Sequence, residues 1–146
     1  LLNGEDVTEK IRLPEISMYA SAVSAIPAVR DYLLDMQRDM AKRCSVIMDG
    51  RDIGTVVLPQ AQVKIFLSAD VEVRARRRTA ELEQRGTPKP YAQVLEEMKE
   101  RDWADSHRET APLRPAEDAI VVDTTNMDFQ QSKEAILQVI GRQLQL

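Results

Sequence analysis

The stretch of sequence that decides the fold is C-S-V-I-M, residues 44–48, followed by D-G-R-D-I-G-T-V-V-L-P, residues 49–59. The apolar run predicts a strand buried on both faces, and polar residues begin where that strand should end. Open α/β sheets bind ligands at the carboxyl ends of their strands. Two carboxylates, Asp49 and Asp52, flank Arg51 beside glycines that let the backbone turn sharply. This pattern predicts a polar recognition loop, with an ordinary charged turn as the alternative for an isolated D-G-R-D.

Composition narrows the classes of protein that fit. The 146 residues are 43% hydrophobic and 30% charged, enough for one compact domain or most of a slightly larger one. Twenty basic against 24 acidic residues give a net charge of −4, which argues against broad nucleic-acid binding, although local arginine clusters suit a small anionic ligand. No apolar run approaches the roughly 20 residues of a membrane span, and no secretion signal opens the chain, so we expect a cytoplasmic protein.

Metal and disulfide chemistry are not indicated. The single cysteine, Cys44, excludes an internal disulfide, and the single histidine, His107, offers no cluster for zinc. We therefore expect no protein-bound metal, and any Mg²⁺ to arrive with a ligand.

The remaining periodicities predict helices alternating with short strands. Asn3-Gly4 favours a type I′ hairpin turn with only two residues before it, so we interpret the chain as part of a longer protein. Pro27 fits the first turn of a helix that runs to about Arg43. We expect strands at 63–67 and 119–122 and helices at 16–25, 71–85, 91–108 and from about 128, the last opened by a capping box of Asp128 and Gln131. This order predicts an α/β domain with a partly parallel sheet.

Two charged clusters lie on the predicted helices. Arg74, Arg76, Arg77 and Arg78 place four guanidinium groups within five residues, which indicates either a solvated basic face or an anion clamp. In the same helix Asp70 is the expected N-cap and Gly86 the expected end.

The second cluster follows the apolar part of the helix at 91–108. Arg101, Asp105 and Arg108 stand at i, i+4 and i+7 on one helix face, as in a surface salt-bridge ladder or a binding site. The presence of D-G-R-D elsewhere favours the binding site. We interpret Trp103 as a packing residue and His107 as solvated.

Taken together, these residues resemble the C-terminal two-thirds of the bacterial cytidylate kinases. The resemblance covers essentially the whole chain: N-G-E-D-V-T, D-G-R-D-I-G-T-V-V-L-P, V-K-I-F-L, the arginine-rich helix, E-R-D-W-A-D-S-H-R-E-T-A-P-L and V-V-D-T-T. It implies a P-loop nucleoside monophosphate kinase fold, a parallel sheet flanked by helices, that moves the γ-phosphoryl group of MgATP to CMP or dCMP. It also implies a monomer with ATP, CMP and dCMP as partners and neither nucleic acid nor membrane.

The resemblance also implies roles for individual residues. In the family, the residues matching Ser21, Arg30 and Asp52 recognise cytosine, and those matching Arg101 and Asp105 hold the ribose. The residues matching Arg51 and Arg108 hold the α-phosphate. Arg74, Arg77 and Arg78 fall in the lid that closes over the transferring group. The residues expected to act in catalysis are Arg51, Arg108, Arg77 and Arg78. Physically, a carboxylate and a hydroxyl can accept from the exocyclic amine of cytosine, while a guanidinium donates to O2 and N3.

One departure from the family limits these expectations. The phosphate loop G-x-x-x-x-G-K-[ST] is absent from this sequence, so we expect the fold to be truncated at its N-terminus and the isolated chain to turn over CMP negligibly. The resemblance implies one truncated domain with four regions. Residues 1–43 form part of the acceptor region, and residues 44–70 contain two core strands and the D-G-R-D loop. Residues 71–108 contain the lid and flanking helices, and residues 109–146 contain a core strand and the C-terminal helix. The alternatives are a related kinase with another small acceptor such as UMP, or a non-catalytic nucleotide-binding or interaction module.

Overall fold

A computed structural model describes residues 1–24 and 26–145, without the side chains of residues 14, 15, 17, 18 and 21. The chain divides into two compact units, the first from Leu1 to Ile47 and the second from Met48 to Leu146.

The first unit opens with the predicted hairpin turn. Leu2 and Glu5 exchange backbone hydrogen bonds of 2.8 and 2.9 Å across it. Asn3 and Gly4 both have positive φ, 50° and 86°, as a type I′ turn requires. The turn predicted from the Asn-Gly pair is therefore confirmed, and a short 3₁₀ helix at Lys10–Arg12 follows it.

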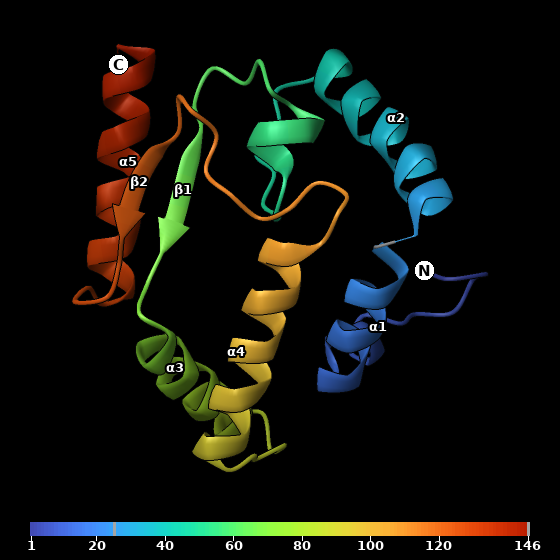
Figure 1. Ribbon diagram of the computed structural model, residues 1–146, viewed down its shortest axis with the longest axis vertical. Helices are drawn as coiled ribbons and strands as arrows, with labels where there is room; N and C mark the ends of the chain where they lie inside the picture. Colours follow the sequence, from blue (N-terminus) through green and yellow to red (C-terminus); the bar gives the residue numbers. More distant parts are fainter. Residues whose placement is uncertain (25, 146) are drawn as a thin grey trace. The chain divides into compact units, whose positions relative to one another are not determined.

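Two helices complete the first unit, α1 at Pro14–Ser24 and α2 at Pro27–Arg43 (Figure 1). Pro27 lies in the first turn of α2, as predicted, where its missing N–H costs nothing. The apolar stripe of α2 stays half-exposed, with Leu33, Met36 and Met40 at 41%, 48% and 46%. No residue of α2 is buried, so among the described residues this stripe forms no closed core.

The predicted strand at 44–48 is wrong. Residues 45–49 adopt neither helix nor strand, and Ile47 is 98% exposed. A strand exists only through hydrogen bonds to a neighbouring strand, and this apolar run has no such neighbour in the described part of the chain. The loop after it also has a local structure that its sequence did not indicate, because Ile53–Val57 form one π-helical turn.

In the second unit, β1 at Ile65–Ser68 and β2 at Ile120–Asp123 pair in parallel (Figure 1). Ile65 is opposite Ile120 and Ser68 opposite Asp123. Both strands were predicted, displaced by one or two residues, and the partly parallel α/β class is confirmed. Figure 1 shows α5, Phe129–Leu144, beside β2, with which it is in contact. The predicted capping box opens α5, since Gln131 N donates to Asp128 Oδ1 at 2.8 Å and Asp128 N donates to Gln131 Oε1 at 2.9 Å.

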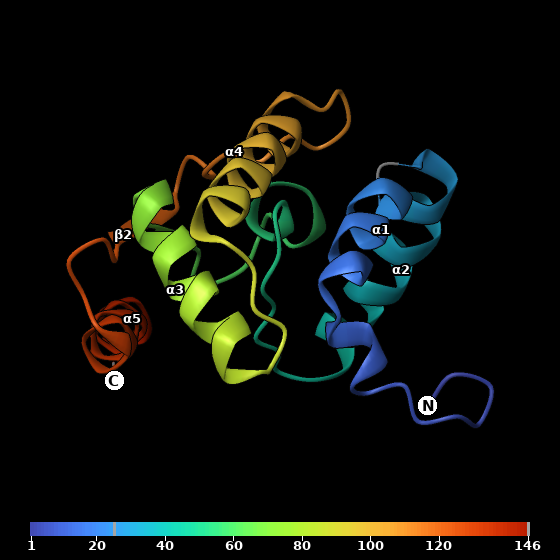
Figure 2. The same cartoon turned by 90° about the horizontal axis from the view of Figure 1, so that it is seen from below.

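The core of the second unit lies between α3, Val71–Gln84, and α4, Tyr91–His107, which run side by side (Figures 1 and 2). Ala75, Leu82 and Val94 are buried there, with Leu95 and Met98 packed against them. Asp70 caps α3 as predicted, accepting from the backbone N–H groups of residues 72 and 73 at 2.8 and 3.3 Å. In the part of the chain that the structure describes, no helix is both long and apolar enough to cross a membrane.

A Schellman motif ends α3 at the predicted glycine. The N–H of Gly86 donates to the carbonyl of Glu83 at 3.1 Å, and the N–H of Thr87 donates to that of Leu82 at 3.0 Å. Gly86 has φ of +72°, a left-handed conformation that costs a residue with a Cβ atom about 1–2 kcal/mol.

We predict opposite effects for two glycine substitutions. Gly86→Ala should destabilise the protein by about 1–2 kcal/mol through backbone strain, because open space surrounds the position and excludes a clash. Gly141→Ala, in the interior of α5 with equally open space, should stabilise by about 0.5–1 kcal/mol. Urea denaturation followed by circular dichroism measures both, and changes of the same sign would contradict the assigned role of Gly86.

A hydrogen-bonded ion pair joins the α3–α4 connection to α4. Lys89 Nζ donates to both carboxylate oxygens of Glu97, at 2.9 and 3.0 Å, and Gln93 Nε2 adds a bond of 2.8 Å. These contacts, the one from Lys89 first, hold the pKa of Glu97 below its ordinary value of 4.5. Stabilisation by Glu97 is therefore complete above pH 4.5 and is lost as the pH falls through the folded-state pKa.

We accordingly predict that Glu97→Gln flattens the loss of stability on acidification. Because the amide that replaces the carboxylate does not titrate, the free energy of unfolding should fall less steeply below pH 4.5 than in the unmodified chain. Denaturation midpoints measured between about pH 3 and 7 test this. Glu83→Gln removes an exposed carboxylate from α3 as the control, and equal flattening by both variants would refute the assignment.

Candidate functional site

The D-G-R-D loop and α4 meet through one buried carboxylate. Arg51 Nε donates to Asp105 Oδ2 at 2.8 Å across 54 residues of sequence, and Asp105 is only 5% exposed. Arg51 thus pairs with α4 rather than within its own loop. The two charged motifs that the sequence set apart are brought together in the second unit.

Two further arginines complete this cluster. Arg101 Nε lies 3.8 Å from the same Asp105 oxygen, one helical turn away on α4. Arg108, which follows the last residue of α4, points its Nη2 toward Asp52 Oδ1 at 3.8 Å and donates from Nε to the Ala111 carbonyl at 2.7 Å. Sequence reasoning placed residues 101, 105 and 108 on one helix face, and the ion pair of residues 101 and 105 agrees with this placement.

The cluster has donor capacity that the protein does not use. Arg101 Nε and Arg108 Nη2 are both buried, and neither has an acceptor within hydrogen-bonding distance. Buried polar atoms in folded proteins are almost always hydrogen-bonded, so each such atom requires an explanation. Three guanidinium groups, those of Arg51, Arg101 and Arg108, also lie around the two buried carboxylates of Asp105 and Asp52. The arrangement can therefore hold an oxyanion.

The side chain of Lys64 contacts the segment that follows the D-G-R-D motif, a role that the sequence analysis missed. Its side chain is 9% exposed, and its Nζ lies 2.6 Å from Asp118 Oδ2 and donates to the Pro59 carbonyl at 2.5 Å. Gly54 permits this, since a Cβ atom there would meet Lys64 Cδ at 3.3 Å. The only signal in the sequence was a lysine inside the otherwise apolar V-K-I-F-L.

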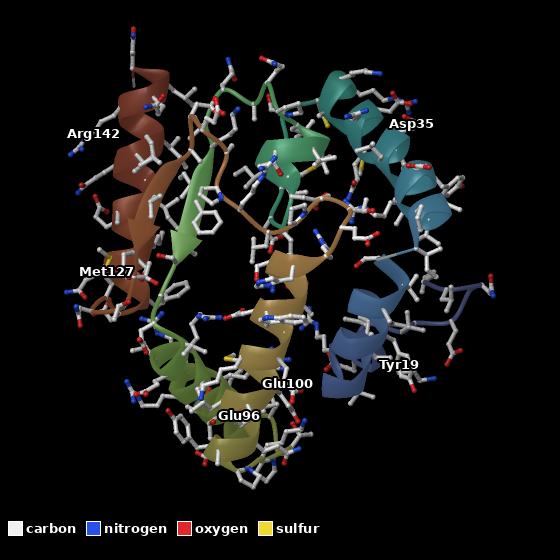
Figure 3. The ribbon with its side chains drawn as sticks, viewed as in Figure 1. Tyr19, Asp35, Glu96, Glu100, Met127 and Arg142 are labelled. Atoms are coloured by element: carbon white, nitrogen blue, oxygen red, sulfur yellow. The ribbon has the colours of Figure 1, made fainter. Side chains whose placement is uncertain are left out.

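The arginines of α3 are engaged by the protein in different ways. Arg74 forms a bidentate pair with Asp102 of α4, at 3.2 and 2.5 Å. Arg77 donates to the carbonyls of Thr124 and Met127, after β2, at 2.6 and 2.8 Å. Arg78 pairs with Glu81 on its own helix at 2.8 Å. Met127 is labelled on the loop between β2 and α5 in Figure 3. Arg74 Nε also donates to the carbonyl of Ala69, just after β1, at 3.0 Å, so Arg74 and Arg77 both lie at the carboxyl edge of the sheet.

Trp103 does not pack as predicted. It is 64% exposed and stacks on His107, with ring centroids 4.7 Å apart. The two rings stand at i and i+4 on α4, so they meet on an outward face while Asp105 is directed inward. His107 is exposed, as expected.

Two candidate residues, Arg30 and Ser21, lie in the first unit. Arg30, in the first turn of α2, donates from Nη1 to the carbonyl of Ser24 at 3.2 Å. Ser21 lies in α1, and its side chain is outside the described residues.

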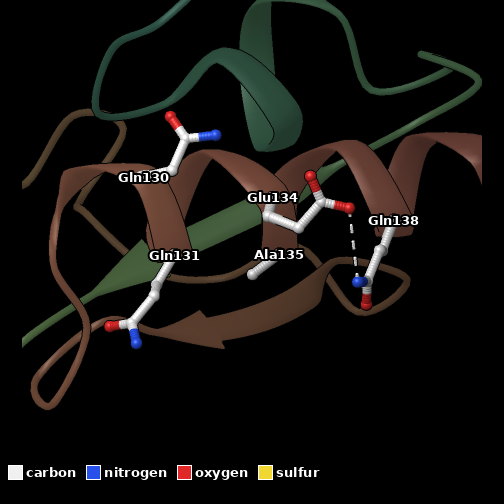
Figure 4. A pocket seen from close by; sticks show the side chains of 5 residues that line it. All are labelled: Gln130, Gln131, Glu134, Ala135 and Gln138. Carbon is white, nitrogen blue, oxygen red and sulfur yellow. Dashed lines mark hydrogen bonds between the residues drawn. The ribbon is translucent and has the colours of Figure 1, made fainter.

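In the described residues, no group of three or more His, Cys, Asp or Glu side chains is arranged to hold a metal ion. A depression on α5 is lined by Gln130, Gln131, Glu134, Ala135 and Gln138 (Figure 4). Its lining contains no cation, so it does not suit a phosphate-bearing ligand.

Fold and site together define a class: an α/β protein whose loop and helix arginines gather around buried carboxylates and keep buried N–H groups without an acceptor. The sequence matches the family described as cytidylate kinase over residues 1–142. The chain belongs to the cytidylate kinase family, which is a family of nucleoside monophosphate kinases.

Several curated relatives are similar along nearly the whole chain. The cytidylate kinase of Caldicellulosiruptor saccharolyticus is 55% identical over 148 residues, covering 99% of this chain and 66% of the relative. That of Caldicellulosiruptor bescii is 56% identical over 138 residues, covering 94% and 61%. That of Carboxydothermus hydrogenoformans is 51% identical, covering 97% and 64%. The chain thus spans slightly less than two thirds of the length of these relatives.

We predict that Asp105→Asn destabilises the second unit by about 1.5–3 kcal/mol, because it removes the charged acceptor of a part-buried hydrogen bond. Glu96→Gln is the matched control on the same helix, labelled in Figure 3; Glu96 pairs with Lys99 at 2.8 Å but is 65% exposed. Its effect should stay within about 0.5 kcal/mol. Urea denaturation compares them, and equal losses would show that Asp105 does not tie the loop to α4.

Proposed function

We propose that the protein containing this chain transfers the γ-phosphoryl group of MgATP to CMP or dCMP, forming CDP or dCDP, on a P-loop nucleoside monophosphate kinase fold. Membership of the cytidylate kinase family supports this. The observation that carries it is the pair of buried, unsatisfied guanidinium atoms on Arg101 and Arg108 beside the D-G-R-D loop. We further propose that the protein acts in the cytoplasm as a monomer.

In this proposal, Arg51 and Arg108 hold the α-phosphate of the acceptor. Arg108 Nη2 is buried and has no hydrogen-bond acceptor, so a phosphate oxygen would satisfy it. Arg51 is 42% exposed along its side chain and can donate from its terminal nitrogens while its Nε stays on Asp105. Charge-assisted bonds from a guanidinium to phosphate are short and directional, which fixes the position of the acceptor.

Arg101 and Asp105 hold the ribose in the same proposal. A carboxylate and a guanidinium offer an acceptor and a donor to neighbouring hydroxyl groups. Asp105 is fixed by Arg51 at 2.8 Å, so its orientation is set before the ligand arrives. Such preorganisation lowers the entropy lost on binding.

Base recognition is assigned to Ser21, Arg30 and Asp52 on the family resemblance alone. A set of acceptors facing the exocyclic amine of cytosine would oppose the O4 acceptor of uracil, so UMP should be disfavoured.

Phosphoryl transfer needs positioning and neutralisation of spread negative charge more than covalent chemistry from the protein. Mg²⁺ bound to ATP would supply part of that neutralisation. We assign the remainder to Arg74, Arg77 and Arg78 on the ATP side and to Arg51 and Arg108 on the acceptor side, with residues 51, 108, 77 and 78 as the catalytic set.

We predict that calorimetric titration of this chain shows tighter binding of CMP than of UMP or AMP. Arg108→Gln should weaken CMP binding by roughly 10- to 100-fold, because a hydrogen bond to a charged partner contributes about 1.5–3 kcal/mol. Glu96→Gln should bind CMP like the unmodified chain. With MgATP added, the chain alone should form no detectable CDP in a coupled assay.

The outcomes separate the competing functions. Equal binding of CMP and UMP would contradict the cytosine assignment and favour a kinase with another small acceptor. Unchanged CMP affinity in Arg108→Gln would contradict the phosphate assignment. CDP formation by the isolated chain would refute its proposed inactivity.

A further inference from the structure

Two arginines of α3 reach the carboxyl edge of the sheet and meet acceptors of different chemistry there. Arg77 donates to two backbone carbonyls, those of Thr124 and Met127, and to the Thr124 hydroxyl at 3.3 Å. These acceptors are neutral, and three of them hold one guanidinium. Arg77 therefore ties α3 to the segment after β2.

Arg74 is held differently. Its Nε donates to the carbonyl of Ala69, just after β1, at 3.0 Å, which orients the guanidinium plane. Its two terminal nitrogens donate to the two oxygens of Asp102 at 3.2 and 2.5 Å. The outer edge of Arg74 thus already adopts the forked geometry that a guanidinium uses with a phosphate group.

The partner of Arg74 can be exchanged at low cost. The side chains of Arg74 and Asp102 are 33% and 39% exposed, and partly solvated ion pairs contribute little to stability. Phosphate oxygens can replace a carboxylate without changing the direction of either N–H. Exchange at Arg77 would instead leave two carbonyls without their donor.

Asp102 also lies beside the acceptor site proposed above. Asp102 and Asp105 stand at i and i+3 on α4, so they are neighbours on the helix surface. Asp105 holds Arg51 and Asp102 holds Arg74. One rigid helix therefore carries a carboxylate partner for each of two arginines from distant segments.

We propose that Asp102 is a positioning residue that keeps Arg74 preoriented at the carboxyl edge of the sheet and competes with a polyphosphate for it. Arg74 is then the arginine of α3 that exchanges its protein partner for a phosphate chain, whereas Arg77 keeps its two carbonyl partners and contributes its positive charge to the ATP side from the place where the protein holds it. This inference rests on the proposed kinase function, since that function supplies a polyphosphate at this edge.

The experiment uses the 146-residue chain and inorganic tripolyphosphate as the probe. Calorimetry compares the unmodified chain, Asp102→Asn, Arg74→Gln and the control Glu100→Gln. Glu100 is an exposed carboxylate on the same helix, labelled in Figure 3, so this control removes the same charge. In parallel, nitrogen-15 NMR follows the Nε–Hε resonances of Arg74 and Arg77 in the unmodified chain, which requires no variant to fold.

We expect Asp102→Asn to bind tripolyphosphate roughly 1.4- to 5-fold more tightly than the unmodified chain, the range of a partly exposed ion pair. Glu100→Gln should change the affinity by less than Asp102→Asn does, and Arg74→Gln should bind tripolyphosphate more weakly than the unmodified chain. The Arg74 resonance should shift on titration while that of Arg77 stays in place. A purely structural ion pair would produce none of these effects.

The inference is overturned if the chain binds no tripolyphosphate, if Glu100→Gln gains as much as Asp102→Asn, or if Asp102→Asn binds less tightly. A shift of Arg77 in place of Arg74 also overturns it. Titration with CMP separates the two proposals. Selective CMP binding alongside any of these results leaves the proposed function standing, whereas loss of CMP selectivity contradicts that function itself.

Discussion

The buried carboxylate of Asp105 is the constraint on which the candidate site depends. An ionised group that is 5% exposed must be paired, and breaking such a pair leaves an uncompensated charge in the interior. Asp105 meets this requirement by binding Arg51 from a loop 54 residues away and by facing Arg101 one turn along α4. The D-G-R-D loop therefore cannot leave α4 without a large cost, and Arg51 and Arg108 remain in one place. A site for a charged ligand needs this fixity, because binding free energy spent on ordering side chains is lost to affinity.

Local signals in the sequence predicted local structure well. The Asn-Gly turn, the Asp70 cap, the Gly86 ending and the box at residues 128 and 131 each depend on groups within a few residues, and all are present. The strand predicted at 44–48 failed for the opposite reason. Strand formation depends on a hydrogen-bonded neighbour that the run itself does not encode, and Ile47 is left 98% exposed.

The same difference between local and long-range contacts decides which parts of the candidate site could be predicted. Periodicity alone placed Arg101 and Asp105 on one face of a helix, whereas Arg108, predicted on the same face, follows the end of α4 in an extended conformation. Periodicity could not indicate that Asp105 would bind Arg51, or that the side chain of Lys64 would lie next to Gly54, because these contacts join distant segments. Trp103 shows a second limit of prediction from the sequence. Large aromatic residues are on average highly buried, yet this one is 64% exposed and stacks on His107, while Asp105 is buried on the same helix.

Helix α4 is rigid, so it fixes the distance between the two carboxylates that it carries. Asp102 and Asp105 are separated by three residues, so their spacing is fixed by helix geometry rather than by loops. Each carboxylate holds an arginine from a different part of the chain, Arg74 from α3 and Arg51 from the loop before the π-helical turn. Two cationic groups are thereby kept at a set separation before any ligand binds. Phosphoryl transfer depends on holding two phosphate-bearing groups in line, and small errors in position reduce the rate steeply. In the kinase proposed above, a helix that spaces its counterions would supply this alignment without moving the backbone, and the partial exposure of the Arg74 pair would let a phosphate chain take over that arginine at little cost.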